Sequence, residues 1–549
     1  MATIILSPGS GSLDLQIAVD AAVPGVDTTI VVSSDIVFID SVIVPANRII
    51  TLTANGDDWI LIGGSFFGSA FIVYGTLNLG EESPFVSGSL IISGFNHGAI
   101  RVENGGNFNM YGGKISGNTS DHHSGGGVRI TNSTFIMYGG EISNNIGFAS
   151  PGGGIGATNS TFIMHGGKIS NNESAYVIPG GGGIYISGNF TMYGGEISGN
   201  TAMLGGGVHV DGLSFMMYDG IISNNTAFFG GGLLANGGVS TMYGGKISSN
   251  TAWDEIWHQG FGGGVYVSSG GSFIMHDGEV SDNTASEEGG GVHIIRSLAG
   301  LPGGGILESN GILNMQGGII RNNIAERGGG VGVWGIFTME GGEVSNNIAQ
   351  KGGGVYTYKY LTGIFNIEAN GIFTMEDGII RNNTARNGGG IYNIGATNIS
   401  GVAEITDNRA TDNGYGQGGG IYTEDFYFLT VTGPDVRFSH NKADFASHRE
   451  AINDAVYATH ILNMEGNWTV PFTQGYNNYD INQDGPRFEF EEEECDKLII
   501  VILLIFICLC CQRKQPCCKD CCKRCYKHCC EHCCKRCCKH CCNHCTSTT

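Results

Sequence analysis

The sequence predicts an all-β protein, a parallel β-helix in which one repeating unit forms each coil. The unit recurs at intervals of 24 to 40 residues, and each copy carries a methionine shortly before a Gly-Gly or Asp-Gly step. Apolar residues alternate with polar ones in short runs, which is typical of strands. Glycine triplets and asparagine pairs recur between the runs, where the chain must turn. The methionines that mark the repeat are Met110, Met137, Met164, Met192, Met217, Met242, Met275, Met315, Met339 and Met375.

One unit reads Phe273-Ile-Met-His-Asp-Gly-Glu-Val-Ser-Asp-Asn-Thr-Ala and then reaches Gly289-Gly-Gly-Val. Its alternating apolar residues predict three short strands, each with one buried side. They are Phe273, Met275, Val280, Val292 and Ile294. No unit has ten residues with helical spacing, so a helical solenoid is disfavoured. With coils about 4.8 Å apart, roughly 16–18 coils would form a rod on the order of 80 Å long.

Asparagine pairs mark one corner of the unit. Because asparagine tolerates the left-handed backbone conformation better than other non-glycine residues, these pairs suit a sharp turn. Stacked on successive coils, their amides are expected to form hydrogen bonds up and down the rod. The pairs are Asn144-Asn145, Asn171-Asn172, Asn224-Asn225, Asn322-Asn323, Asn346-Asn347 and Asn382-Asn383.

The combination of Gly-Gly-Gly-Val/Ile with Ile-Ser-x-Asn, over about residues 100–445, resembles the Gly-Gly-Ala-Ile and Phe-x-x-Asn repeats of the polymorphic membrane proteins. This resemblance implies right-handed coils, a pectin lyase-like fold and display on a cell surface. Two departures stand out. Glycine replaces the family's alanine at Gly127, Gly207, Gly291 and Gly390. We also expect no outer-membrane barrel of the bacterial type, and therefore a protist-like, single-pass arrangement rather than autotransport.

The chain divides into segments of different composition. Residues 1–27 include helical spacing from Leu13 to Val23, which predicts a short helix that caps the first coil. An ordinary surface helix is the alternative. Residues 28–445 are expected to form the β-helix, irregular at first and regular over 109–445. Residues 446–494 lose the repeat and become acidic, so they predict a C-terminal cap and stalk.

Residues 498–511 form an uninterrupted apolar run, and they predict one transmembrane helix. At 1.5 Å per residue the run spans about 21 Å, short of the roughly 30 Å hydrocarbon core, so Lys497 and Arg513 would have to snorkel. A buried helix in a terminal cap is the alternative. The start of the chain does not resemble a signal peptide. Basic residues after the run place the tail, 512–549, in the cytoplasm and the β-helix at the cell surface.

All 18 cysteines lie between Cys495 and Cys545, many of them in pairs separated by Lys, Arg or His. Cysteines beside a membrane suit reversible S-acylation. The acylation candidates are Cys508, Cys510, Cys511, Cys517 and Cys518. Zinc or copper(I) binding is a second interpretation, and a low-complexity expansion without defined chemistry is a third. Weak metal candidates, by their spacing, are Cys518, Cys521, Cys530 and Cys533.

The charge distribution excludes nucleic acid as a partner. The formal net charge is −22, and the chain after Cys511 is itself basic, with nine Lys or Arg against two acidic residues. A body this acidic repels phosphates. We expect no enzyme activity and no cofactor, because the acidic residues recur singly at equivalent positions, a pattern of a solvated outer row or of weak calcium contact at best. These are Glu141, Glu196, Glu279 and Glu343.

Two other residue types recur without a clear chemical role. Histidines 122, 123, 165 and 276 are expected at the surface. Nine Asn-x-Ser/Thr sequons permit glycosylation without establishing it, and those at the corners are expected to be masked by stacking. The sequons begin at Asn118, Asn132, Asn159, Asn172, Asn189, Asn224, Asn382, Asn398 and Asn467.

Insertions between repeats are the expected ligand-contact loops, because loops that project from one side of a solenoid often bind partners. Packing of these loops onto the rod is the alternative. The candidate residues are Trp253, Trp257, Phe261, Tyr356, Tyr358 and Tyr360. The sequence thus predicts an adhesin-like surface protein that binds a protein or glycan on a host or neighbouring cell. A membrane-displayed carbohydrate-active enzyme and a purely structural coat are the other hypotheses.

Overall fold

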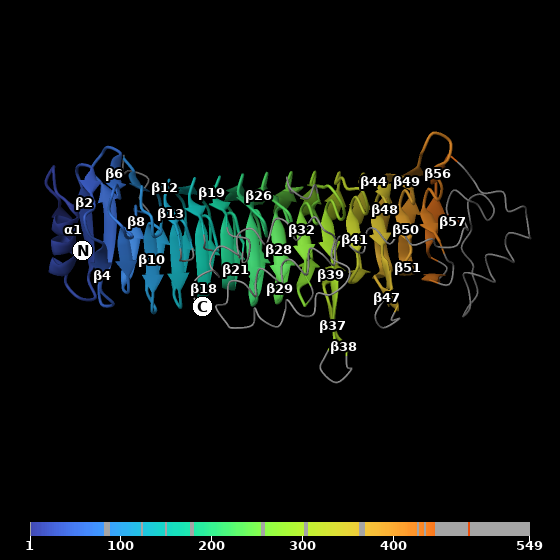
Figure 1. Cartoon of the computed structure of the whole chain (residues 1–549), viewed down its shortest axis with the longest axis horizontal. Coiled ribbons are helices and arrows are strands. Elements are labelled where there is room, and N and C mark those ends of the chain that lie inside the picture. The colour runs from blue at the N-terminus through green and yellow to red at the C-terminus, as the bar shows by residue number, and fades with distance from the viewer. Residues whose placement is uncertain are drawn as a thin grey trace, which may run out of the picture. The chain divides into compact units, whose positions relative to one another are not determined.

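The computed structural model describes residues 2–81, 88–121, 125–148, 151–175, 180–253, 259–268, 270–300, 306–361, 368–424, 428–432, 435–444 and 481–483. They form a parallel β-solenoid of about 14 turns, with the coils stacked along one axis (Figure 1). The solenoid belongs to a compact unit, Met1–Gly485. A second unit, Pro486–Thr549, lies outside the described residues.

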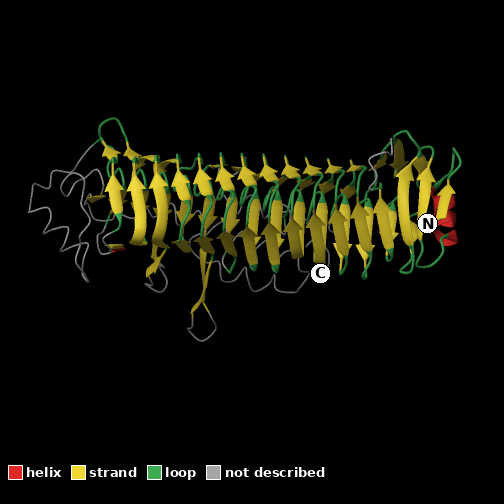
Figure 2. Ribbon diagram, turned by 180° about the vertical axis from the view of Figure 1, so that it is seen from behind, coloured by secondary structure: helices red, strands yellow, loops and turns green. Residues whose placement is uncertain are grey.

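Three ladders of parallel strands run along the solenoid, and Figure 2 shows how strands dominate the fold. The strands that follow the glycine triplets, or occupy the same place in irregular coils, form the G ladder. Its strands are β4 (Val42–Val44), β7 (Phe71–Val73), β10 (Ile100–Glu103), β14 (Val128–Thr131), β18 (Ile155–Met164), β21 (Ile184–Met192), β24 (Val208–Asp211), β28 (Leu233–Asn236), β32 (Val265–Val267), β36 (Val292–Ile294), β41 (Val331–Val333), β45 (Val355–Thr357), β50 (Ile391–Asn393), β53 (Ile421–Thr423) and β57 (Ile481–Gln483).

The Phe-x-Met strands form the F ladder, in which the long strands β18, β21, β48 and β51 also take part. Its strands are β1 (Ala2–Ile5), β2 (Asp27–Val32), β5 (Ile49–Ala54), β8 (Thr76–Leu79), β11 (Asn107–Met110), β15 (Thr134–Met137), β25 (Ser214–Met217), β29 (Val239–Met242), β33 (Ser272–Met275), β39 (Ile312–Met315), β42 (Ile336–Met339), β48 (Ile372–Arg381), β51 (Ala396–Thr406) and β54 (Leu429–Val431).

The Glu-Ile-Ser strands and their equivalents form the S ladder, which β48 and β51 also join. Its other strands are β3 (Ile36–Val37), β6 (Trp59–Ile62), β9 (Leu90–Ser93), β12 (Lys114–Ser116), β16 (Glu141–Ser143), β19 (Lys168–Ser170), β22 (Glu196–Ser198), β26 (Ile221–Ser223), β30 (Lys246–Ser248), β34 (Glu279–Ser281), β40 (Ile319–Arg321), β43 (Glu343–Ser345) and β55 (Arg437–Ser439).

A fourth, very short strand follows the asparagine corner, and the expectation of three strands per coil is wrong in this respect. The reason is that a two-residue Thr-Ala strand is too short to show alternation in the sequence. The strands of this T ladder are β13 (Thr119–Ser120), β17 (Ile146–Gly147), β20 (Glu173–Ser174), β23 (Thr201–Ala202), β27 (Thr226–Ala227), β31 (Thr251–Ala252), β35 (Thr284–Ala285), β44 (Ile348–Lys351), β49 (Thr384–Asn387), β52 (Arg409–Ala410) and β56 (Lys442–Ala443).

The core is lined by two inward rows from the F ladder, two from the G ladder and one from the S ladder, as the alternation predicted. In the unit that begins at Phe273, all five expected core residues, from Phe273 to Ile294, have 0 % exposure. Phenylalanines of successive coils stack, with Phe162 and Phe190 ring centroids 4.9 Å apart. Each coil therefore buries its apolar side only against its neighbours, which is how a solenoid is stabilised.

The asparagine corner forms the predicted hydrogen-bond ladder, and only the second residue of each pair takes part. Asn225 Nδ2 donates to Asn250 Oδ1 at 3.0 Å and to the carbonyl of Ile197 at 3.0 Å. The same pattern runs from Asn118 to Asn441, and these ladder side chains are buried. The first residue of each pair, such as Asn224, has φ near +56° and makes the turn.

The glycine triplet explains why alanine is absent from its third position. A Cβ built on Gly207 would lie 2.6 Å from the carbonyl oxygen of Gly232 and 2.9 Å from Asn225 Nδ2. Carbon atoms do not approach these groups so closely without a backbone shift. The asparagine ladder and the third glycine are therefore parts of one tightly packed corner.

The ends of the solenoid differ from the sequence expectation in detail. Helix α1 (Ser12–Ala21) lies at the N-terminal end, as expected for a cap, with Leu15 and Val19 buried (Figure 1). Strand β1, inside the expected cap, pairs with β2 and starts the F ladder. Strand β57, inside the expected stalk, pairs with β53 and continues the G ladder. The solenoid has fewer coils than the 16–18 expected because the insertions use residues outside the stack.

Two insertions between repeats, in residues 296–311 and 356–371, form antiparallel hairpins. One pairs β37 (Arg296–Gly300) with β38 (Ile306–Asn310), and the other pairs β46 (Lys359–Leu361) with β47 (Glu368–Asn370). Both leave the same edge of the stack (Figure 1). The described part of the chain includes no helix long and apolar enough to span a membrane. The predicted transmembrane run 498–511 and the tail lie outside the described residues.

Candidate functional site

The middle residue of each short G strand faces away from the core. These residues pair with one another from coil to coil in the strand register, for example Tyr266 with His293 and Tyr356 with Tyr392. The row consists of Tyr185, His209, Leu234, Tyr266, His293, Gly332, Tyr356, Tyr392 and Tyr422, and we call it the outer aromatic row. Its side chains are covered despite facing outward, with exposure of 8 % or less.

The residue before each glycine triplet covers this row. The first glycine of the triplet has positive φ, for example 67° at Gly262, so the chain folds back there, and Phe261 lies beside the G strand of the next coil. Phe261 lies 5.5 Å from the His293 ring, and Phe229 lies 4.9 Å from the Tyr266 ring. The covering row consists of Leu204, Phe229, Phe261, Glu288, Arg327 and Lys351.

The covering row changes from apolar to charged at Glu288, whose side chain has 0 % exposure. Arg327 Nε lies 2.8 Å from Glu288 Oε1, and the indole N–H of Trp334 donates to Glu288 Oε2. His293 Nδ1 lies 3.7 Å from the same Oε2. Burying a carboxylate is costly unless it is paired and hydrogen-bonded, and these partners meet that requirement.

The surroundings of this cluster keep the side chains of His293 and Tyr266 neutral. Burial, followed by the positive charge of Arg327, lowers the pKa of His293 to about 3. Burial, followed by the carboxylate of Glu288, raises the pKa of Tyr266 above its usual range. Glu287 also pairs with Arg327, at 3.1 Å. His293 is therefore neutral at neutral pH, and Tyr266 keeps its proton there.

Trp334 connects the buried cluster to the surface between the hairpins. Its ring stacks on Tyr358 with centroids 4.0 Å apart and planes 7° apart. Gly332 occupies the outer aromatic row at this coil, and a Cβ there would lie only 2.9 Å from His293 Nδ1. The glycine thus lets the histidine pack closely beneath the stacked aromatic pair.

The hairpin bases flank this pair and carry cations. Arg296 Nη1 donates to the backbone carbonyl of Asn370 at 3.4 Å, which links the base of one hairpin to the base of the other. Lys359 Nζ lies 4.4 Å from the centroid of the Phe428 ring. Two half-buried aromatic rings between two hairpins, with arginine and lysine nearby, form a surface suited to contact with another molecule.

Some of the predicted ligand-contact residues pack onto the rod, and others lie at the surface. Phe261 and Tyr356 are buried, with 6 % and 3 % exposure, so they pack onto the rod, which was the alternative expectation. Trp253 is 40 % exposed, and Tyr358 is half-buried against Trp334. Trp257, the side chain of Tyr360 and all the candidate cysteines lie outside the described residues. Glu288, Arg327 and Trp334 were missed, although glutamate stands where the three preceding coils have leucine or phenylalanine.

The other predicted rows lie on the surface. Glu141, Glu196 and Glu279 form ion pairs of 3.0–3.1 Å with lysines of the neighbouring S strands. Burial raises the pKa of Glu279, but hydrogen bonds from Ser281, Arg321 and Lys246 outweigh it and lower that pKa to about 2. His165 and His276 are exposed, as expected. Over the described ranges, no group of three or more His, Cys, Asp or Glu side chains is placed to hold a metal ion.

The sequons differ in accessibility. Asn118 and Asn172 belong to the buried ladder, as the masking expectation requires. For the corner sequons at Asn224 and Asn382 the masking expectation is wrong, because these residues occupy the turning position of the corner and are exposed. Asn132, Asn159, Asn189 and Asn398 are also exposed, and Asn467 lies outside the described residues.

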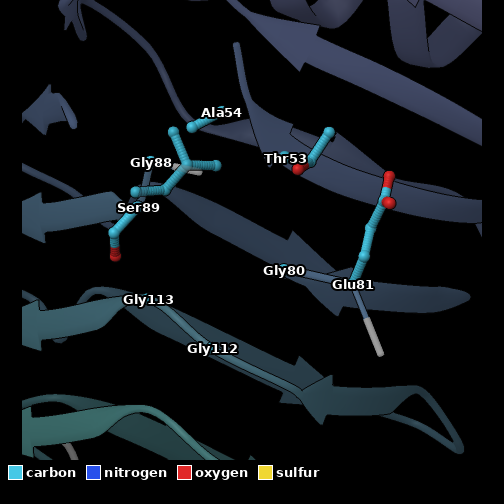
Figure 3. Close-up of a pocket in the computed structure, with 9 residues that line it drawn as sticks. Thr53, Ala54, Gly80, Glu81, Gly88, Ser89, Gly112 and Gly113 are labelled. Carbon is cyan, nitrogen blue, oxygen red and sulfur yellow. The ribbon is translucent and has the colours of Figure 1, made fainter. Parts of the chain in front are cut away.

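A shallow pocket of about 110 Å³ lies far along the chain from the hairpins (Figure 3). Glycines 80, 88, 112 and 113 form much of its wall, together with Thr53, Ala54, Ser89 and Leu90. Glu81 is the only charged residue among those that line it. A pocket of this size and composition holds a few water molecules and offers little chemistry.

The fold places this chain among the parallel β-solenoids. Comparison with protein-family models, with curated proteins and with solved structures finds no match. Its function must therefore be inferred from its own geometry.

Proposed function

We propose that the chain is an adhesin-like protein of the cell surface, and that the coils bearing the two hairpins contact its ligand. The observation that carries this proposal is the clustering of both insertions. They are linked at their bases by Arg296 and Asn370, and Trp334, in the coil between them, stacks on Tyr358 at the base of the second hairpin. Insertions that were only tolerated could fall at any corner of any coil, whereas a binding surface needs several loops side by side, and these two leave the same corner of nearby coils.

The buried cluster beneath the hairpins supports the same proposal. Glu288, Arg327 and His293 fix the position of Trp334 from below, and a rigid aromatic anchor loses little conformational entropy on binding. The ligand would be a protein or glycan on a host or neighbouring cell. The right-handed coil, the anchor at 498–511 and the cytoplasmic tail complete the proposal, and they rest on the sequence.

A membrane-displayed carbohydrate-active enzyme is the alternative, and it requires two carboxylates that face one groove. The outer carboxylates are instead held by cations: Arg321 makes two hydrogen bonds to Glu279, and Arg381 makes two to Glu343. These contacts favour binding over hydrolysis. A structural coat is the third possibility, and it predicts no ligand.

The test is a cell-binding assay with the full-length chain displayed on beads. In one variant each hairpin is cut to a two-glycine turn, which removes residues 297–309 and 360–369 and keeps Arg296 and Asn370. We expect the beads to bind cells of the source organism, and the variant to lose most of that binding while keeping its β-sheet circular dichroism. Lys168→Ala, in a distant ion pair, is the matched control and should bind normally. Equal binding by the hairpin variant would refute the site, and no binding by any form would favour the coat.

A further inference from the structure

The outward face of the F ladder carries no charge over nine successive coils, from β8 to β39. Three positions per coil face outward here: two in the strand and one just after it. By coil they are Thr76, Asn78, Gly80; Asn107, Asn109, Tyr111; Thr134, Ile136, Tyr138; Thr161, Ile163, His165; Asn189, Thr191, Tyr193; Ser214, Met216, Tyr218; Val239, Thr241, Tyr243; Ser272, Ile274, His276; and Ile312, Asn314, Gln316. None is Asp, Glu, Lys or Arg. We call this surface the neutral face.

One margin of the neutral face is a continuous stack of aromatic rings. Seven rings stack with centroids 4.7–5.0 Å apart and planes within 11° of parallel. They belong to Tyr111, Tyr138, His165, Tyr193, Tyr218, Tyr243 and His276. The tyrosines from Tyr138 to Tyr243 are 41–47 % exposed. Since the ring faces cover one another, it is the ring edges that meet solvent.

These properties restrict what the face can bind. Sugars and nucleobases that stack on aromatic rings need free ring faces, and the stack uses them up. An ionic polymer needs opposite charges, which the face lacks. What the face offers is a flat array repeated at the spacing of β-strands, about 4.8 Å, and another β-stack has the same period.

Charge points to a second copy of this chain as that partner. The chain has a net charge of −22, so two copies repel each other over most approaches. Carboxylates begin just past the neutral face, at Asp219 and Asp277 in the following turns and at Glu340 in the next coil. We propose that two copies associate through their neutral faces, F ladder against F ladder, because this approach leaves carboxylates only at the margins of the contact and none within it.

The size of the face predicts a reversible dimer. The face extends over nine coils spaced about 4.8 Å apart and over about 15 Å along each strand. These dimensions give about 600 Å² on each partner. The total of about 1,200 Å² lies at the lower edge of specific interfaces. Sheets packed face to face lie about 10 Å apart, which leaves room for Ile136, Met216 and Ile274 to interdigitate with their counterparts.

The test uses the full-length chain with a benzophenone amino acid in place of Tyr218. A second form carries the same cross-linker in place of Ile348, which is 49 % exposed on the T ladder and serves as the control. On irradiation at micromolar concentration, we expect a covalent dimer from the Tyr218 form and none from the Ile348 form. Adding Met216→Glu and Ile274→Glu should lower the dimer yield at least about tenfold, because like charges then face each other.

Charged substitutions on the T ladder, Ile324→Glu with Ile348→Glu, should leave the dimer yield from position 218 unchanged. Circular dichroism of both double variants would show that the fold is kept. Three results would overturn the proposal: no dimer from position 218, equal dimer from both positions, or a cross-link from position 218 only to the chain's own residues. A cross-link only to a different protein would also overturn the proposal, because the partner of the neutral face would then be that protein.

Discussion

Two rows of side chains run along this solenoid and follow opposite rules. At the asparagine corner, the same residue recurs in every coil from Asn118 to Asn441 and makes the same hydrogen bonds. In the outer aromatic row, by contrast, tyrosine, histidine, leucine and glycine replace one another from coil to coil. Both rows are buried, so burial alone does not decide which row can vary.

The difference comes from what each side chain must satisfy. An asparagine of the corner gives hydrogen bonds to buried carbonyl and amide oxygens and accepts others, so any replacement leaves several polar groups unpaired. A residue of the outer row fills space beneath the covering row, and several apolar shapes can do this. Sequence change is therefore possible on the outside of each coil, and there the hairpins and the Glu288 cluster arose.

The largest expected loss of stability comes from replacing one asparagine of the corner. Asn225→Leu removes the partner of the Ile197 carbonyl and the acceptor of both the backbone and side-chain N–H groups of Asn200. With each unpaired buried group costing about 1–3 kcal/mol, the total loss is about 4 kcal/mol. Because a solenoid need not unfold in one step, amide hydrogen exchange in the surrounding coils is the measurement.

Asn224→Gly is the matched control for that variant, since Asn224 is exposed and has φ near +56°. Glycine adopts this conformation without strain, so the local stability should change by less than about 0.5 kcal/mol. If the two variants behaved alike, the ladder would not be what distinguishes the corner.

A smaller loss of stability is expected from a change at Glu288, which carries the one buried carboxylate among the described residues of the covering row. Glu288→Gln leaves Arg327 with Glu287 as its remaining ion-pair partner, and it weakens the contact with Trp334. The expected loss is about 3 kcal/mol, close to the lower range for a broken buried pair. Thermal unfolding followed by tryptophan fluorescence measures it. Glu340→Gln, at an exposed position of the F ladder, should change the melting temperature very little.

The stability of the coils should also fall in acid, because His209 of the outer aromatic row is buried. Burial lowers the pKa of His209 to about 4, although the Asp211 carboxylate acts in the opposite direction. The folded pKa lies below the unfolded value near 6.5, so the stability is complete above pH 6.5 and falls as the pH drops towards 4. At pH 4.5 the loss is about 2.5 kcal/mol, from about 1.4 kcal/mol per pKa unit.

His209→Leu tests this dependence, because Leu234 already occupies the same row in the next coil. We expect the variant to fold normally at pH 7 and to lose less stability than the wild-type chain between pH 6.5 and 4.5. Part of the acid sensitivity should remain, since burial also lowers the pKa of His293, to about 3. Identical pH profiles for the two proteins would exclude His209 as a source.

The same contrast explains what the sequence could predict. The core residues and the asparagine ladder were predictable because each recurs in many units, so a single model of one coil explains all of them. The Glu288 cluster was not, because its members Glu288, Arg327 and Trp334 come from two coils, occur once each and meet only after the coils stack. The hairpin positions were visible as breaks in the repeat, whereas the contact between their bases was not.

The smallest effect is expected in the charged row of the S ladder, which has the period of the asparagine ladder but lies in solvent. Lys168 Nζ lies 3.0 Å from Glu196 Oε1, and both side chains are more than 40 % exposed. The pKa of Glu196 is lowered first by its hydrogen bond with Ser198 and only then by Lys168, so the carboxylate keeps a partner when the lysine is removed. Lys168→Ala should therefore cost at most about 0.5 kcal/mol, and salt should abolish the difference. Hydrogen exchange at low and high salt measures it, and a cost as large as that of Asn225→Leu would show that period, rather than burial of polar groups, stabilises the coils.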